Sequence, residues 1–190
     1  EGGAWAYLGS ATGPAAVANW HAEGDQAGAW FGSAVTTAGD INGDSYADLL
    51  IAARLYDPTG SLIDAGRVVE FHGSNLGPAL QANWTLDGTQ SGAVLGWSIA
   101  TAGDVNGDGY ADIIVGQPLY TGLVTSDGRA QVILGGLNGL RPPPAVWTTA
   151  GGQPNAQCGF AVAGAGDTNG DTFGDVIVGT PYYDDHSNTD

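Results

Sequence analysis

A five-position pattern of oxygen-bearing residues occurs three times in this chain. Each copy has Asp, Asn, Asp and Asp at positions one, three, five and nine, with an aromatic residue at position seven. These side-chain oxygens, together with the main-chain carbonyl of position seven, can converge on one hard cation. The predicted ligands are Asp40, Asn42, Asp44, Tyr46 and Asp48 in the first loop, Asp104, Asn106, Asp108, Tyr110 and Asp112 in the second, and Asp167, Asn169, Asp171, Phe173 and Asp175 in the third.

Calcium is the metal that this donor set favours. Ca²⁺ accepts roughly six to eight oxygens at flexible angles, whereas Mg²⁺ demands a tighter octahedron. No His or Cys lies within the three patterns, which argues against zinc and copper. A helical EF-hand would need a ligand at position 12, where this chain has Ile51, Val115 and Val178. We therefore predict three Ca²⁺, one in each loop.

An alternative interpretation of each loop is an Asn-Gly hairpin turn flanked by solubilising Asp residues. The recurrence of the whole pattern at steps of 64 and 63 residues favours the metal site over this alternative. Moreover, three carboxylates confined to one short loop repel one another unless a cation is present.

The elements that must position these loops repeat with them. Trp20, Trp84 and Trp147 stand 64 and 63 residues apart, in the same register as the loops. Small and β-branched residues precede each loop, and an uninterrupted apolar run such as Leu49–Ile51 follows it, as expected for a strand buried on both faces. Two further strand-like segments complete each unit. Four short strands in each unit of 63 or 64 residues predict an all-β fold made of β-propeller blades.

The repeat predicts one propeller segment over residues 1–190, holding three four-stranded blade-equivalents. Glu1–Ser10 aligns with Ala65–Ser74, so the chain starts at a third strand and stops after a second strand. It is therefore expected to be a mature or excised piece. The predicted divisions are blade one at 31–86, blade two at 95–149, and a split blade whose first two strands lie in 158–190 and whose third and fourth strands lie in 1–22.

Three blades are too few to close a ring, because propellers usually have about four to eight. We therefore expect two copies to exchange their ends and form a homodimer with a six-bladed ring. The N-terminal strands of one copy would then complete the third blade of the other. Such an arrangement leaves no sheet edge unpaired.

The sequence resembles the FG-GAP repeat of the integrin α-subunit propeller over essentially the whole chain. The resemblance rests on Phe31-Gly32, on Gly39-Asp40-Ile-Asn-Gly-Asp44 and on the apolar strand that follows. The Gly-Ala-Pro element reads Gly116-Gln117-Pro118 and Gly179-Thr180-Pro181, and Ala53-Arg54-Leu55 replaces it in the first unit. Phe-Gly becomes Leu95-Gly96 and Cys158-Gly159. The resemblance implies a secreted or cell-surface propeller in which calcium is a structural ion.

Charge and composition exclude several classes of partner. Twenty acidic residues against four basic ones give a net charge of −16, which repels phosphate backbones and anionic lipid surfaces. No apolar stretch is long enough to insert in a membrane. The single Cys158 excludes an intrachain disulfide, and its register in the repeat predicts a buried thiol.

The function expected from these features is a calcium-stabilised, non-catalytic binding or adhesion module outside the cell or at its surface, or a self-assembling propeller fragment. We expect no enzyme activity, because no order of Ser, His and Asp and no activated thiol stands out. A carbohydrate-binding lectin and a non-catalytic part of a secreted hydrolase remain as alternatives. The ligand would be a protein or a glycan, and Trp5, Trp30 and Trp97 are candidates for stacking on sugars or for irregular packing.

Overall fold

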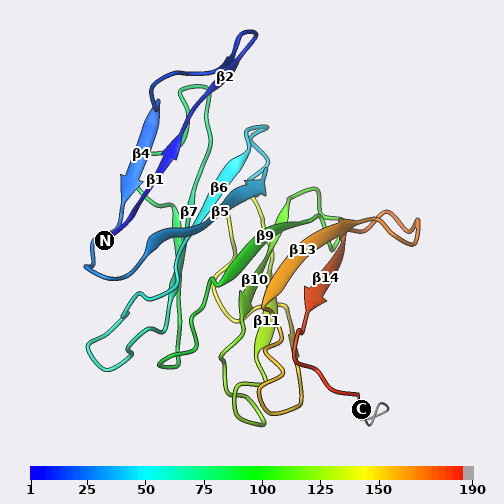
Figure 1. Ribbon diagram of the computed structural model, residues 1–190. Helices are drawn as coiled ribbons and strands as arrows, with labels where there is room; N and C mark the ends of the chain where they lie inside the picture. The colour runs from blue at the N-terminus through cyan, green and yellow to red at the C-terminus, as the bar shows by residue number, and fades with distance from the viewer. Residues whose placement is uncertain (186–190) are drawn as a thin grey trace.

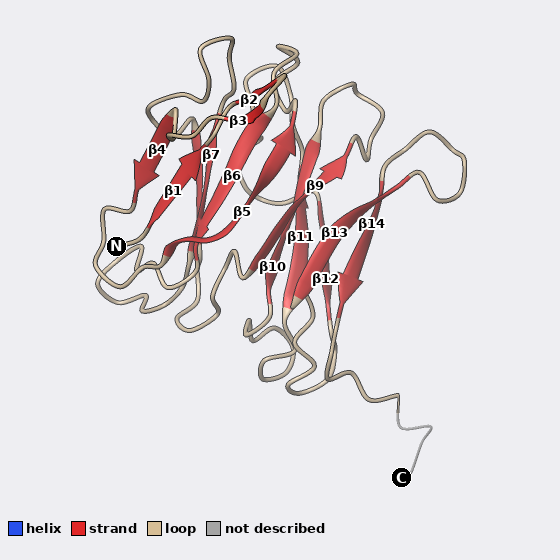
Figure 2. Ribbon diagram, turned by 45° about the horizontal axis from the view of Figure 1, so that its top comes forward, coloured by secondary structure: helices blue, strands red, loops and turns tan. Residues whose placement is uncertain are grey.

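The computed structural model describes residues 1–185, and this part of the chain consists entirely of short strands and turns (Figures 1 and 2). No helix capable of crossing a membrane occurs among these residues. The strands are β1 (Gly3–Ala6), β2 (Gly9–Ser10), β3 (Gly13–Pro14), β4 (Trp20–Glu23), β5 (Phe31–Gly39), β6 (Asp48–Ala53), β7 (Arg67–Phe71), β8 (Trp84–Asp87), β9 (Ser98–Gly103), β10 (Asp112–Gln117), β11 (Arg129–Ile133), β12 (Trp147–Ala150), β13 (Ala161–Gly166) and β14 (Asp175–Gly179).

Two complete blades form the middle of the molecule. Strands β5 to β8 make one four-stranded antiparallel sheet, called blade one here, and β9 to β12 make the second, called blade two. In both sheets consecutive strands are neighbours, and the apolar run after the acidic loop forms the second strand. That strand is buried on both faces, which explains why its sequence is continuously apolar and does not alternate.

Two half-blades lie at the ends. Strands β1 and β4 pair as β7 and β8 do, so that Ala6 opposite Trp20 corresponds to Glu70 opposite Trp84. Strands β13 and β14 pair as β5 and β6 do. This architecture confirms the predicted all-β fold made of propeller blades. Within one chain the two half-blades lie at opposite ends of the arc (Figure 1), and their union with a second copy stays a prediction. Residues 186–190 of the predicted segment 158–190 lie outside the described residues.

The sheets stack through their faces, with the first strands β5, β9 and β13 next to one another (Figure 2). Three apolar cores fill the spaces between them. Leu50, Val68 and Ile113 belong to the core between blades one and two. Phe31 and Phe71 belong to the core beneath the N-terminal half-blade, and Ile114 belongs to the core against the C-terminal half-blade. Each blade therefore depends on its neighbours to bury its faces.

Glycines set the spacing between sheets at three equivalent points. Gly2, Gly66 and Gly128 each form an isolated parallel bridge to a residue at or just before the start of the next first strand: Phe31, Leu95 and Cys158 respectively. All three adopt the left-handed conformation, with φ of 99°, 89° and 72°. A Cβ atom on Gly66 would collide with the main chain of Leu95, so no other residue permits this approach.

Strand pairing corrects one detail of the repeat alignment. Ala53 pairs with Arg67 and Gln117 pairs with Arg129, so Ala53 corresponds to Gln117. The residues that replace the Gly-Ala-Pro element in blade one are consequently 52–54 rather than 53–55, and Arg54 occupies the position of a proline. Cys158 is buried, as predicted, and burial raises the pKa of its thiol.

The repeated tryptophans pack between blades only where a neighbour covers them. Trp20 is buried, contacts Phe71 edge-on at 5.0 Å and donates its indole N–H to the carbonyl of Ala79 at 2.8 Å. Trp84 is partly buried against the central core. Trp147 is 42% exposed, because no third strand is present on the sheet beside it.

One acidic residue interrupts the central core. Glu70 on β7 is fully buried, and neither of its carboxylate oxygens has a hydrogen-bond partner among the described residues. The nearest basic group is His72, whose Nε2 lies 3.5 Å from Oε1 of Glu70. Ala6 and Val132 occupy the equivalent positions in the other units. Burial, reinforced by the charge of Asp48, raises the pKa of Glu70 from 4.5 to about 8.

This raised pKa predicts a pH-dependent stability that Glu70→Gln removes. The folded state binds an extra proton between pH 4.5 and about 8, so the contribution of Glu70 to stability is lost as the pH rises through this range. The free energy of unfolding of the parent, relative to Glu70→Gln, should fall by an amount on the order of a few kcal/mol. Urea unfolding at pH 5, 6.5 and 8 measures it. Glu23→Gln, an exposed acid on β4, is the matched control, and a parent curve parallel to that of Glu70→Gln would contradict the expectation.

Candidate metal centre

The three acidic loops are the hairpins that join first and second strands. They connect β5 to β6, β9 to β10 and β13 to β14, and they project from the same end of their sheets (Figure 2). In each hairpin a bulge shifts the strand register beside the loop, between Thr37 and Gly39 in the first. The fold therefore brings all five predicted positions of each pattern together in one tight turn.

Position one organises the turn. Asp40 Oδ1 accepts hydrogen bonds from the amides of Gly43 at 2.7 Å and Asp44 at 3.0 Å, and Oδ2 accepts one from Ser45 at 2.8 Å. Left-handed backbone at Gly43 and Ser45, with φ of 77° and 71°, turns these amides inward. The same bonds recur around Asp104 and around Asp167. In the third loop the amide of Thr172 and its neighbours lower the pKa of Asp167.

Positions three and five are linked to each other. The side-chain nitrogen Nδ2 of Asn42 donates to Asp44 Oδ2 at 3.0 Å, and the side-chain oxygen of Asn42 accepts the main-chain amide of Asp44 at 2.9 Å. Asp44 Oδ1 then accepts the amide of Tyr46 at 2.9 Å, which fixes position seven. Equivalent bonds hold the pairs Asn106 and Asp108, and Asn169 and Asp171.

Position nine is the anchor of the loop in its blade. Asp48 is fully buried, and its two oxygens accept the amides of Ile41 at 3.0 Å and Gly73 at 2.7 Å. Asp112 is buried in the same way, between the amides of Val105 and Gly135. Burial raises the pKa of both carboxyl groups, despite these two amides. The third equivalent, Asp175, is only half-buried and accepts from the amide and hydroxyl of Thr168.

Neighbouring loops contact one another directly. The amide of Ala111 donates to the carbonyl of Asp40 at 2.9 Å, and the amide of Gly174 donates to the carbonyl of Asp104 at 2.7 Å. The ring of Tyr110 lies over Gly43, and the ring of Phe173 lies over Gly107. Position seven therefore has a packing role that the sequence pattern did not reveal: its side chain covers the glycine of the preceding loop.

The structure places the fifteen predicted residues in three equivalent hairpins, but the carboxylates already accept main-chain amides. Those at positions one and five accept amides of their own loop, and Asp48 and Asp112 also accept Gly73 and Gly135 from outside it. Among residues 1–185, no three Asp, Glu, His or Cys side chains come together in a cation-holding arrangement. The ligand assignment therefore stays a prediction. The donor set nonetheless fits a hard cation, since every side chain in it supplies oxygen and each carboxylate has lone pairs beyond those taken by amides.

Sequence reasoning missed one residue at the second loop. The guanidinium of Arg141 donates to Asp108 Oδ2 at 2.9 Å, so a positive charge already meets a predicted ligand there. Arg141 lies 33 residues beyond Asp108, between β11 and β12, and its counterpart in blade one is Ala79, so no periodic signal marks it.

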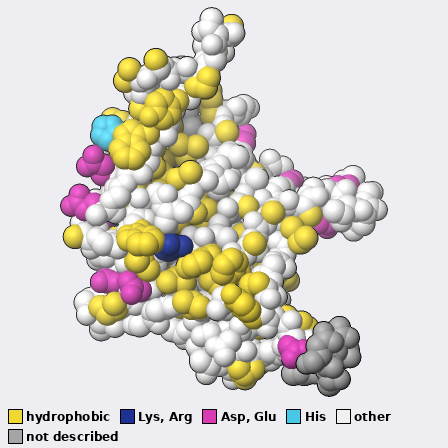
Figure 3. Space-filling view, viewed as in Figure 1, with side chains coloured by type: hydrophobic (Ala, Val, Ile, Leu, Met, Phe, Trp, Pro, Cys, Tyr) yellow, Lys and Arg dark blue, Asp and Glu magenta, His cyan; other side chains and the backbone are white. Residues whose placement is uncertain are grey.

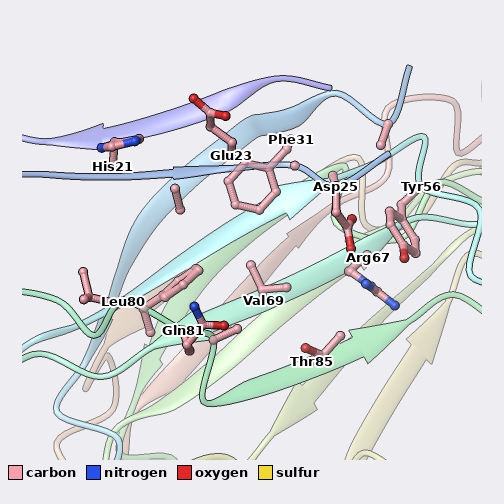
Figure 4. A pocket seen from close by; sticks show the side chains of 16 residues that line it. His21, Glu23, Asp25, Phe31, Tyr56, Arg67, Val69, Leu80, Gln81 and Thr85 are labelled. Carbon is pink, nitrogen blue, oxygen red and sulfur yellow. The ribbon is translucent and has the colours of Figure 1, made fainter. Parts of the chain in front are cut away.

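A separate cleft lies between the N-terminal half-blade and blade one (Figure 4). Polar side chains line its rim, but its guanidinium, Arg67, is already paired with Asp87 at 2.6 Å and stacked on Tyr56 at 3.7 Å. The rings of Phe31 and Phe71 at its floor are buried. This cleft offers hydrogen-bonding groups, and no arrangement of a nucleophile with a base is present among its lining residues.

Comparison with known proteins identifies the same family that the sequence pattern of the acidic loops resembles. The FG-GAP repeat matches residues 31–69 and 95–133, which are the first three strands of blades one and two. The third acidic loop lies outside both matches. Mouse integrin alpha-IIb is 36% identical over 161 residues, covering 82% of this chain and 15% of that protein.

Two invertebrate relatives are similar to the same extent. Drosophila melanogaster integrin alpha-PS2 is 36% identical over 171 residues, covering 82% of this chain and 12% of that protein. Caenorhabditis briggsae integrin alpha pat-2 is 34% identical over 168 residues, covering 81% and 13%. The chain thus spans 12% to 15% of the length of these relatives. With its two matched repeats and its sheets stacked as blades, the chain belongs to the FG-GAP repeat family and forms part of an integrin α-like β-propeller.

Proposed function

We propose that this chain is a calcium-stabilised, non-catalytic binding module of the adhesion type, acting outside the cell or at its surface. The observation that carries the proposal is the threefold recurrence of one oxygen-rich loop with one internal geometry. Its similarity to integrin α subunits favours adhesion over catalysis. Calcium sites of extracellular modules bind at about millimolar affinity, and such sites are filled outside cells and mostly empty in the cytosol.

Calcium would supply charge neutralisation in these loops. Each loop confines three carboxylates, two of them exposed or half-buried at positions one and five and one at the base of the hairpin. The backbone is already curved by its left-handed residues, so a cation would find the oxygens of positions one, three, five and nine on one short turn. The residues that would hold the ion in the first loop are Asp40, Asn42, Asp44, Asp48 and the carbonyl of Tyr46.

Removal and return of the metal should reveal three sites. After chelation and dialysis, calorimetric titration is expected to give about three Ca²⁺ per chain, because the three loops share one donor set. Zn²⁺ should bind more weakly, since no His or Cys is present in the loops. A stoichiometry of zero, or a preference for Zn²⁺, would remove calcium from the proposal.

Substitutions at positions five and nine should distinguish a role in metal binding from a role in holding the fold. Asp44→Ala removes an exposed ligand, so we expect it to lower the melting temperature in calcium and to have little effect in chelator. Asp48→Ala leaves the buried amides of Ile41 and Gly73 without an acceptor, so it should lower the melting temperature by several degrees in both conditions.

Scanning calorimetry of both variants and the parent, with calcium and with chelator, measures the difference. Glu23→Gln, which neutralises an exposed acid on β4 outside the three loops, serves as a control for loss of one negative charge. Equal loss of stability by Asp44→Ala with and without calcium would contradict a metal role for position five.

We also propose that the two half-blades of this chain are completed by a second copy. The support is a set of exposed apolar residues whose counterparts in the middle of the molecule are buried. Val35 is 61% exposed while its counterpart Ile99 is 9% exposed, and Ile177 is 61% exposed while its counterpart Ile114 is fully buried. Tyr7, in the N-terminal half-blade, corresponds to Phe71, which is buried.

The uncovered faces are complementary in position. Exposed Trp147 on β12 corresponds to Trp20, which packs on Phe71, so a third strand carrying Tyr7 would cover it. The free edge of β14 corresponds to the edge of β6 that pairs with β7, and β1 corresponds to β7. A second copy therefore supplies the missing strand, side chain and sheet edge at both ends together.

Sedimentation should then report a dimer, with twice the chain mass of 19.1 kDa. Ile177→Asp places a charge on the face to be covered and should give a folded monomer, whereas Leu76→Asp, at a site that is 89% exposed on a distant loop, should stay dimeric. Deletion of residues 1–22 should also abolish the dimer. A compact parent monomer at micromolar concentration would overturn the assembly and leave the calcium proposal intact.

A further inference from the structure

A row of three aromatic side chains and one guanidinium crosses the blades at the end opposite the acidic loops. Trp30 precedes β5, Arg54 follows β6, Trp97 precedes β9 and Phe160 precedes β13. The guanidinium carbon of Arg54 lies 4.7 Å from the ring centre of Trp30 and 4.4 Å from that of Trp97. The ring of Trp97 in turn lies 5.3 Å from that of Phe160. The row thus runs from blade one to the C-terminal half-blade.

The row is on the surface. Trp30 is 53% exposed and Phe160 is 38% exposed, while Arg54 and Trp97 are half-buried. In the view of Figure 3, apolar side chains gather on both sides of a single basic patch near the middle of the face. Solvent therefore reaches both ends of the row.

Arg54 differs from the other three cations in having no polar partner. Arg67 is paired with Asp87 and Arg141 with Asp108, and Arg129 donates to Gln117 at 2.8 Å. No carboxylate and no hydrogen-bond acceptor meets the guanidinium of Arg54 within the described part of the chain. Among the described residues of a chain of net charge −16, Arg54 is thus the one cation with neither an acid nor a neutral hydrogen-bond acceptor.

The two indoles decide how this guanidinium can bind. Its carbon lies over the face of both rings, so the indoles hold the cation in place while its N–H groups have no acceptor among the described residues. A planar guanidinium held in this way is pre-organised for two parallel hydrogen bonds to a carboxylate. The exposed rings on either side offer flat apolar surfaces of the kind that pack against the C–H face of a pyranose.

A hollow lies beside Trp30. It is lined by Gly28, Gly32 and Ser33, with Glu1 at its edge, and the Ser33 hydroxyl in it donates to the carbonyl of Ala52 and accepts the amide of Arg54. Glu1 is an acid, so it opposes an anion in this hollow and sets a limit on affinity. Arg54 stands where the other two units have Pro118 and Pro181, so the guanidinium is a feature of blade one alone.

We propose that Trp30, Arg54, Trp97 and Phe160 form a binding site for an acidic saccharide, whose carboxylate pairs with Arg54 and whose sugar rings stack on the exposed aromatic rings. The flat rings on both sides of Arg54 favour a saccharide over an acidic peptide, which would need the guanidinium but not the rings. The site rests on the binding-module function proposed above, and it needs none of the loop residues.

Calorimetry with a glucuronic acid-containing oligosaccharide tests the site. The parent should bind it, and the same oligosaccharide with its carboxyl groups reduced to alcohols should bind about tenfold more weakly or worse. Arg54→Gln should lose a similar factor, and Arg54→Lys should lie between, because lysine keeps the charge but not the two parallel donors. Trp30→Ala should weaken both oligosaccharides. Glu1→Gln should strengthen binding of the acidic one.

Tyr182→Ala, an exposed aromatic side chain outside the row, is the matched control and should bind as the parent does. Melting curves of all variants establish that each is folded. Absence of saccharide binding, or binding unchanged in Arg54→Gln, overturns the proposal. Equal binding of a poly-glutamate peptide would also overturn it, in favour of a peptide ligand. Since calcium stoichiometry is measured separately, a protein that binds three Ca²⁺ and no saccharide refutes the site without refuting the module.

Discussion

The second and third strands of the two complete blades are buried on both faces, and this constraint underlies the rest of the structure. A sheet of this kind cannot face water on either side, so it is stable only between two others. Leu50 and Ile113 of successive blades therefore meet in one core, while Ile51 and Phe71 turn the opposite way into another. The same constraint explains why Val35 and Ile177, on strands next to the two ends of the arc, are exposed although their counterparts Ile99 and Ile114 are buried.

The acidic loops depend on this stacking. Asp48 and Asp112 hold their hairpins by accepting an amide from just beyond the neighbouring third strand, so each loop is attached to the body of its own blade. Each loop is also attached to the next through a main-chain hydrogen bond and an aromatic ring. The loops are thus a continuous band along one end of the sheets. Because the third blade lacks its outer strands here, Asp175 is less buried than its two counterparts.

The repeated features could be predicted from the sequence, and the features unique to one blade could not. Strand order and the five-position loops follow from residue types that recur at steps of 64 and 63. The direction of the loop carboxylates does not, since it depends on left-handed residues at Gly43 and Ser45 that turn the amides inward. Likewise, the contact of Arg54 with Trp97 joins residues from two blades, and nothing in the local pattern of either segment indicates it.

The burial of Glu70 is another feature that could not be predicted from the sequence. Its strand, Arg67–Phe71, reads as an ordinary third strand, and a carboxylate within it would be expected on a solvated face. The neighbouring blade removes that face from water, so the sequence position alone does not indicate a buried acid whose oxygens have no hydrogen-bond partner among the described residues.

The glycine bridges have a consequence for the shape of any ring built from these units. Side chains of varied size fill the cores, but consecutive sheets also meet main chain on main chain, at Gly2, Gly66 and Gly128. The angle between neighbours is therefore set by the peptide backbone and is insensitive to drift in core residues. Duplication of such a unit adds a constant turn each time. The number of blades in a closed ring of such units then depends on these glycine contacts. The core residues can differ between copies without changing it.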